Sequence, residues 1–154
     1  MSVVRAVSLL LIAFAISGCT LGGGSNSSAT APSQSINTET LSGTVAAAVN
    51  GAPQSSFNTF TVGQGGGTVT VTLTSAVETL PGGTVNSTVA MGMGVGNVSG
   101  ASCVLLAGTA PQILSAGATA SLSGTLAAGT FCVLISDVTI QTGPVSYTVV
   151  VQHP

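Results

Sequence analysis

The chain is almost free of charged side chains. Its 154 residues contain a single lysine or arginine, Arg5, together with three acids, Glu39, Glu78 and Asp137, and one histidine, His153. Binding to nucleic acid requires lysine and arginine to neutralise phosphates, and docking on anionic lipid requires the same side chains. We therefore expect no nucleic-acid partner and no electrostatic attachment to a membrane. Disorder is not expected either, because disordered chains combine high net charge with low hydrophobicity, whereas 45% of these residues are hydrophobic.

Aromatic residues are scarce as well. The sequence has no tryptophan, one tyrosine and four phenylalanines. Valine, leucine, isoleucine and alanine must therefore fill any core. With the ends set aside, somewhat over a hundred residues remain, which is roughly the size of one domain with a modest margin of stability.

The few ionisable side chains leave little material for a catalytic site. Glu39 borders a predicted linker and His153 is the penultimate residue, so we expect both to lie at mobile ends. Glu78 and Asp137 remain as a candidate carboxylate pair, but an aspartate at the end of a strand more often caps a turn. A serine triad or a zinc site would need His153, and zinc would also need two cysteines at no recognised spacing. We therefore predict no catalytic residue, no cofactor, no metal site and no enzymatic activity.

Residues 1–18 have the three-part layout of a secretory signal peptide. Arg5 precedes an apolar run from Ala6 to Ile16, and small residues follow that run. The run is shorter than the roughly 20 residues that a membrane-spanning helix needs. The alternative interpretation is a buried N-terminal helix.

Residues 16–19, Ile-Ser-Gly-Cys, resemble the lipobox of bacterial lipoproteins. The resemblance implies that Cys19 is diacylated and becomes the new N-terminus after cleavage. Two or three acyl chains anchor a protein stably, whereas one chain binds only marginally. Thr20 implies, by resemblance to enterobacterial sorting rules, that the protein is not retained at the inner membrane. We therefore expect an exported protein with a lipid anchor in the cell envelope, at the outer membrane on its periplasmic or its surface face.

The cysteine count agrees with lipidation. Three cysteines in an exported protein leave one over, and lipidation of Cys19 removes the odd one. Cys103 and Cys132 remain as a pair in an oxidising compartment, where disulfides persist. A bridge would close a loop of about 30 residues, worth roughly 3–4 kcal/mol in the chain-entropy model. The alternative is a pair of buried free thiols.

Residues 19–38 comprise the lipidated Cys19 and a predicted flexible linker. From Thr20 to about Asn37 the chain is mostly glycine, serine, asparagine, threonine, alanine and proline, with almost nothing to bury. Such a segment spans about 25 Å on average. The domain at residues 39–154 is therefore expected to stand off the membrane.

Residues 39–154 read as short β-strands separated by turn residues. Residues 67–74 alternate strictly and place Val69, Val71 and Leu73 on one face, which predicts a half-buried strand. Residues 145–151 alternate in the same way, and residues 130–135 are apolar on both faces, as in a central strand. Further strands are predicted near residues 41–49, 56–62, 88–95, 102–107 and 119–126, with breakers at 63–66, 81–83, 96–97, 127–129 and 142–144. Seven or eight short strands predict an all-β antiparallel sandwich or jelly roll, and helices over 41–49 or 113–122 are the alternative.

Two parts of this region resemble bacterial pre-peptidase C-terminal-like domains. Phe57-x-x-Phe60-x-Val62 followed by residues 66–73 resembles the start of that family, and residues 126–133 with 146–149 resemble its end. The resemblance covers about residues 40–152 and implies a compact β-sandwich that serves exported enzymes as a non-catalytic accessory module. Some members bind calcium through acids in the strand that corresponds to residues 89–95. This sequence has no acid there, so calcium binding is not implied.

Two functional hypotheses follow from this pattern. The first is a non-catalytic binding or structural module whose ligand is a protein or a glycan, contacted through neutral threonine, serine, asparagine and glutamine side chains. The second is an assembly component that self-associates or docks through strand edges, because the lysines that protect edges are absent. The oligomeric state is left open by the sequence.

Overall fold

The computed structural model describes residues 34–107 and 109–154, so the predicted signal peptide 1–18 and Cys19 lie outside the described residues. The described part contains ten strands and no helix, and so no helix long and apolar enough to cross a membrane. In chain order the strands are β1 Asn37–Val45, β2 Ser55–Val62, β3 Gly67–Thr79, β4 Val85–Asn86, β5 Ala90–Ser99, β6 Ser102–Leu105, β7 Gln112–Ser115, β8 Ser121–Leu126, β9 Gly129–Asp137 and β10 Val145–His153.

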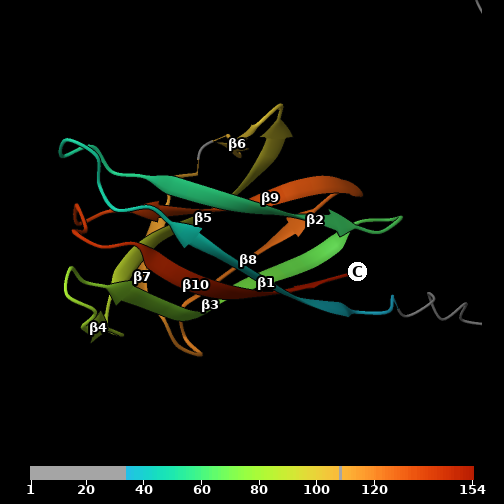
Figure 1. Cartoon of the computed structure of the whole chain (residues 1–154). Coiled ribbons are helices and arrows are strands. Elements are labelled where there is room, and N and C mark those ends of the chain that lie inside the picture. Colours follow the sequence, from blue (N-terminus) through green and yellow to red (C-terminus); the bar gives the residue numbers. More distant parts are fainter. Residues whose placement is uncertain (1–33, 108) are drawn as a thin grey trace, which may run out of the picture. The chain divides into compact units, whose positions relative to one another are not determined.

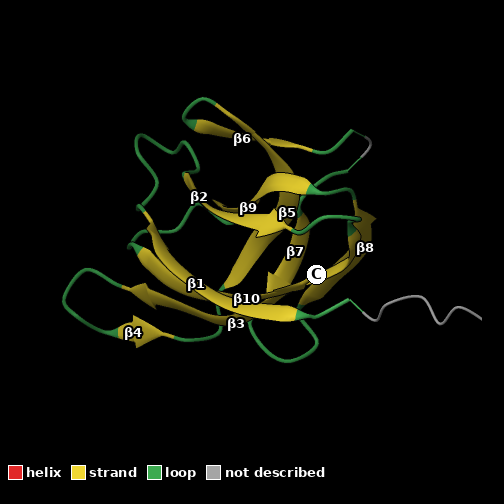
Figure 2. Ribbon diagram, turned by 90° about the vertical axis from the view of Figure 1, so that its right-hand side faces the viewer, coloured by secondary structure: helices red, strands yellow, loops and turns green. Residues whose placement is uncertain are grey.

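The strands form two five-stranded antiparallel sheets that pack face to face (Figures 1 and 2). The first sheet has the order β1-β10-β3, and both β4 and β8 pair with the remaining edge of β3. The second sheet has the order β2-β9-β5, and both β6 and β7 pair with the remaining edge of β5. The predicted all-β antiparallel sandwich is therefore confirmed.

The core lies between the sheets and follows the predicted alternation. β3 buries Val69, Val71 and Leu73, as its sequence predicts. β9 lies between β2 and β5, so the predicted central position of residues 130–135 is also confirmed. The other strands add aliphatic, sulfur-containing and aromatic side chains, among them Phe60, Met91, Met93, Val133, Ile135, Val145, Tyr147, Val149 and Val151.

The predicted break at residues 96–97 is wrong, because these residues lie inside β5. Gly92, Gly94 and Gly96 alternate with core-facing residues and leave the other face of β5 without side chains over residues 92–96. A Cβ on Gly96 would collide with the main-chain oxygen of Val104 and would lie 3.0 Å from Cys103 Sγ. Glycine is therefore present here because the following chain packs closely on the strand, not because the chain turns.

Other differences concern short strands and strand ends. β4 and β7, with 2 and 4 residues, are not predicted, because so few residues carry no readable alternation. No residue of 113–122, the alternative helix, is helical. β1 begins at Asn37, two residues before the predicted start of the domain at residue 39. Its first two residues pair with His153 and Gln152 of β10, which extends the strand into the predicted linker.

Candidate functional site

Cys103 and Cys132 form a disulfide that fastens β6 to β9. Both strands pair with β5, where Cys103 lies opposite Val98 and Cys132 lies opposite Gly96. The Cα atoms are 5.9 Å apart, within the usual range for a disulfide. The predicted bridge is confirmed, and neither sulfur is a thiol that could act as a nucleophile.

Asp137 caps the turn that follows β9. Its Oδ1 accepts a hydrogen bond from the backbone N–H of Thr139 at 2.9 Å, and its Oδ2 accepts one from that of Gln141 at 2.8 Å. The residue is only 4% exposed. Both carboxylate oxygens are occupied by the backbone, which confirms the interpretation of Asp137 as a turn cap.

Glu78 binds the same β9–β10 loop from the first sheet. Its Oε1 accepts hydrogen bonds from the backbone N–H groups of Thr142 and Gly143, each at 3.0 Å. Glu78 is 6% exposed. The two acids that could have formed a catalytic pair therefore both hold the backbone of residues 138–144, which is a structural role.

The backbone of this loop is strained at Ile140. Its φ is +57°, in the left-handed region that a β-branched residue rarely adopts. The side chain is 56% exposed, so no burial of Ile140 compensates the strain. The neighbouring Gln141 is buried, and its Nε2 donates to Thr139 Oγ1 at 3.2 Å and to the main-chain oxygen of Ala90 at 3.4 Å. The surrounding hydrogen bonds therefore impose the loop conformation on Ile140.

The expectation that Glu39 and His153 lie at mobile ends is wrong. His153 is 2% exposed, and its Nε2 lies 3.0 Å from Glu39 Oε1. Its Nδ1 lies 3.0 Å from the main-chain oxygen of Pro154. The pairing of β1 with β10 brings the two residues together. The alternation of β10 continues through His153, so the inward direction of this side chain was readable from the sequence.

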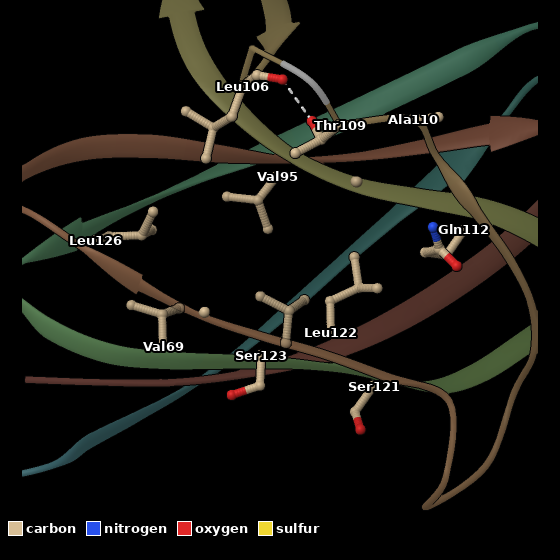
Figure 3. A pocket seen from close by; sticks show the side chains of 13 residues that line it. Val69, Val95, Leu106, Thr109, Ala110, Gln112, Ser121, Leu122, Ser123 and Leu126 are labelled. Carbon is tan, nitrogen blue, oxygen red and sulfur yellow. Dashed lines mark hydrogen bonds between the residues drawn. The ribbon is translucent and has the colours of Figure 1, made fainter.

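An open cleft of about 470 Å³ lies between the sheets, beside β8 and the segment that joins β6 to β7 (Figure 3). Its apolar side chains are those of Val69, Val71, Val95, Leu106, Ala110, Leu122 and Leu126. Thr109, Gln112, Ser121 and Ser123 add neutral polar groups, and the last two point away from the hollow in Figure 3. None of the described lining residues is charged or aromatic.

The two lateral edges of the sandwich differ. On the β1–β2 side, Tyr147 of β10 reaches across the sheets, and its hydroxyl donates to Asn58 Oδ1 at 2.7 Å. Asn58 Nδ2 in turn donates to the main-chain oxygen of Ser42 at 3.3 Å, which closes this edge. On the other side, the edge of the second sheet is interrupted between β6 and β7. Gly124 of β8 has no atom within 4 Å of where a Cβ would lie, and the cleft opens here.

The polar side chains that line the described cleft carry hydroxyl and amide groups. Its described residues include no acid, base or thiol, and the ionisable side chains lie elsewhere, in contacts that hold the fold. No group of three or more histidines, cysteines or acids in the described residues could hold a metal ion. No local pattern of the sequence indicates the cleft, because its residues come from β3, β5, β7, β8 and the segment between β6 and β7.

No protein-family model matches the chain, and no curated protein matches it. The resemblances to the lipobox and to pre-peptidase C-terminal-like domains therefore stay predictions.

Proposed function

We propose that this protein is an exported lipoprotein, anchored through Cys19, whose β-sandwich is a non-catalytic binding or structural module in the cell envelope. One observation carries the non-catalytic part of the proposal. The three acids, the histidine and both cysteines of the described residues each make a contact that holds the fold, and the cleft that remains is uncharged. A site of this kind can bind an uncharged partner, but its described lining has no acid or base to transfer a proton or to activate its hydroxyl groups as nucleophiles.

A protein partner fits the cleft better than a glycan does. Sugar rings usually pack their C–H groups against exposed aromatic rings. In the described part, Phe60, Phe131 and Tyr147 are buried and Phe57 is half-buried, so no exposed aromatic ring is available. Aliphatic walls with neutral polar groups at the rim suit aliphatic side chains of another protein. The partner of the cleft is therefore proposed to be an uncharged protein surface.

Site-specific photo-crosslinking in cells that express the full chain tests this proposal. A photoreactive residue is placed at Gln112, which is exposed and lines the cleft. A matched control carries it at Ser146, which is exposed on the outer face of β10. We expect an adduct with another protein at Gln112 and none at Ser146. We also expect Leu106→Asp, which places a charge in the cleft, to abolish it.

The proposal would be contradicted by equal crosslinking at the two positions or by an adduct that Leu106→Asp leaves unchanged. Far-UV circular dichroism of the Leu106→Asp protein shows whether the fold survives. If that variant does not fold, the neutral Leu106→Asn and the smaller Leu106→Ala take its place, with a graded loss of the adduct expected.

The second candidate function, assembly through strand edges, is favoured by a separate observation. The outer edge of β8 pairs with no strand among the described residues. This edge lies beside the cleft and carries the inference that follows.

A further inference from the structure

β8 presents an unprotected strand edge. One edge of β8 pairs with β3 through six residue pairs, from Thr72↔Ser121 to Gly67↔Leu126. The N–H and C=O groups on its other edge have no partner strand in the described structure. Natural proteins usually protect such edges with lysine, proline, a bulge or an inward-pointing charge. β8 reads Ser-Leu-Ser-Gly-Thr-Leu and contains none of these devices.

The two faces of β8 differ in chemistry. Leu122 and Leu126 point toward the cleft and pack partly against the core. Ser121, Ser123 and Thr125 are exposed on the other face, where Ser123 lies opposite Thr70 with 3.2 Å between the hydroxyl oxygens. Any strand that adds to β8 must match aliphatic residues on one face and hydroxyl residues on the other, because directly opposite residues share a face.

A second copy of β8 has the aliphatic and hydroxyl residues in the positions that this requirement calls for. Consider two copies of β8 that pair antiparallel about a two-fold axis. The axis is perpendicular to the sheet and passes midway between the two Gly124 residues. Each Leu122 then lies opposite Leu126 of the second copy, and each Ser123 lies opposite Thr125 of the second copy. Gly124 lies opposite its own counterpart, so no two side chains face each other at the axis. Both faces match in this register, which is the self-complementarity that a two-fold interface requires.

We infer that β8 is a dimerisation strand that joins the first sheets of two copies of this chain into one continuous sheet, in the register Gly124 to Gly124. The hydroxyl row on the outer face then runs unbroken from Thr70 through Ser123 of one copy to Thr125 and Thr68 of the second. On the inner face the two leucine pairs are formed by Leu122 and Leu126, which line the cleft of each copy. A second copy is the favoured occupant because a foreign strand would have to reproduce this pattern by chance.

The proposed interface is small, but the proposed lipid anchor would favour the dimer by concentrating the two copies in one membrane. One strand pair alone buries too little area for a tight complex. Two copies held in one membrane meet at a much higher effective concentration than free proteins do. The inference rests on the proposed anchor only for this concentration effect, and its register can be tested whether or not the anchor exists.

Cysteine crosslinking of the full chain in isolated membranes tests the register. Residues that face each other across an antiparallel pair have Cα atoms about 4.5–5.5 Å apart, which suits a disulfide. We expect oxidised Gly124→Cys to give a covalent dimer on a non-reducing gel. Thr125→Cys alone should give little, because its partner is Ser123. Membranes from cells that express Ser123→Cys together with Thr125→Cys should give the dimer again. Peptide mass spectrometry confirms that the Cys103–Cys132 bridge is intact in each sample.

A charge at the axis provides a second, independent test. Gly124 has open space where a side chain would lie and no positive φ, so Gly124→Ala and Gly124→Lys should both fold. Like charges directly opposite each other destabilise a strand pair. In detergent-solubilised full chain, light scattering over a concentration series should give a dimer dissociation constant at least twofold higher for Gly124→Lys than for Gly124→Ala, and equal constants would contradict the inference.

Each outcome decides the inference. Equal crosslinking at Gly124→Cys and Thr125→Cys, or none at either, would overturn it. A Gly124→Cys adduct with a different protein would mean that a foreign strand occupies the edge, which also overturns it. If the protein has no lipid anchor, it remains in solution without detergent, and this outcome is distinguished from a failure of the dimer. In that case the same crosslinking is carried out on the soluble protein at high concentration.

Discussion

Glu78 and Asp137 lie on opposite sheets and hold the backbone of one loop between them. Asp137 occupies both of its oxygens with N–H groups at the start of the β9–β10 loop, and Glu78 binds two N–H groups at its end. The sheets are therefore tied together at this corner by charge-assisted hydrogen bonds to backbone, without any basic side chain.

Asp137→Asn should destabilise the domain more than Glu78→Gln does. Both oxygens of Asp137 accept hydrogen bonds, so an amide would set an NH2 donor against a backbone N–H and leave it unpaired. Glu78 accepts through Oε1 alone, and glutamine keeps that acceptor. We expect a loss of about 1–3 kcal/mol for Asp137→Asn. Urea unfolding of both variants measures the difference, and equal losses would contradict this account of the loop.

Ile140→Asn should stabilise the protein. Asparagine tolerates the left-handed backbone at this position, whereas a β-branched residue is strained there by roughly 1–2 kcal/mol. Ile113→Asn is the matched control, because Ile113 is also exposed, at 67%, but lies in β7 without a positive φ. We expect a higher melting temperature for Ile140→Asn and no increase for Ile113→Asn. A lower melting temperature for Ile140→Asn would show that the contacts of the isoleucine side chain stabilise the fold by more than the backbone strain at this position destabilises it.

Removal of the disulfide should lower stability without changing the fold. The bridge closes a loop with a sequence separation of 29 residues. The chain-entropy model gives about 3–4 kcal/mol for a loop of this size. The double variant Cys103→Ala, Cys132→Ala should therefore unfold at a lower urea concentration while its far-UV circular dichroism stays unchanged. An unchanged midpoint would contradict the prediction, and the mass of the unreduced parent protein confirms that the bridge was present.

Cys19→Ala should release the protein from the membrane or leave it unprocessed. The predicted lipid anchor is attached to this thiol, and Ala cannot be acylated there. Fractionation of cells and the mass of the N-terminal peptide measure the two outcomes. Cys103→Ala serves as the control that removes a cysteine and keeps the anchor. A Cys19→Ala protein that is still processed and still partitions into detergent would rule out the lipoprotein proposal.

Alternation made the strands of the core predictable. Val69, Val71 and Leu73 point inward because every second residue of a strand faces the same way, and that pattern needs no knowledge of the partner strand. The same argument fails for Gly96, where glycine indicates a close approach of β6 and not a turn. Whether a glycine in a strand breaks it or admits a neighbour depends on packing, which a local sequence window does not contain.

The site residues were predictable only where the interaction is local. Asp137 binds residues two and four positions later, so its role as a turn cap followed from its place at a strand end. Glu78 binds residues 64 and 65 positions away, and no spacing rule indicates that contact. For His153 two local signals disagree: a position near the end of the sequence favours mobility, whereas the alternation that continues through it favours the buried position it has.

The pairing of β1 with β10 has a consequence for how the domain folds. Asn37 pairs with His153, so the first described strand is completed by the last one. β10 is also the strand that lies between β1 and β3, so β1 is not joined to the rest of the first sheet until β10 is in place. A chain emerging from the ribosome or from a translocation pore therefore cannot complete its fold strand by strand. It must wait until residue 153 is free, and then pay the large loop-closure entropy of a long-range pairing in one step. Domains dominated by such non-local pairings fold in roughly milliseconds to seconds, and this domain should fall in that range.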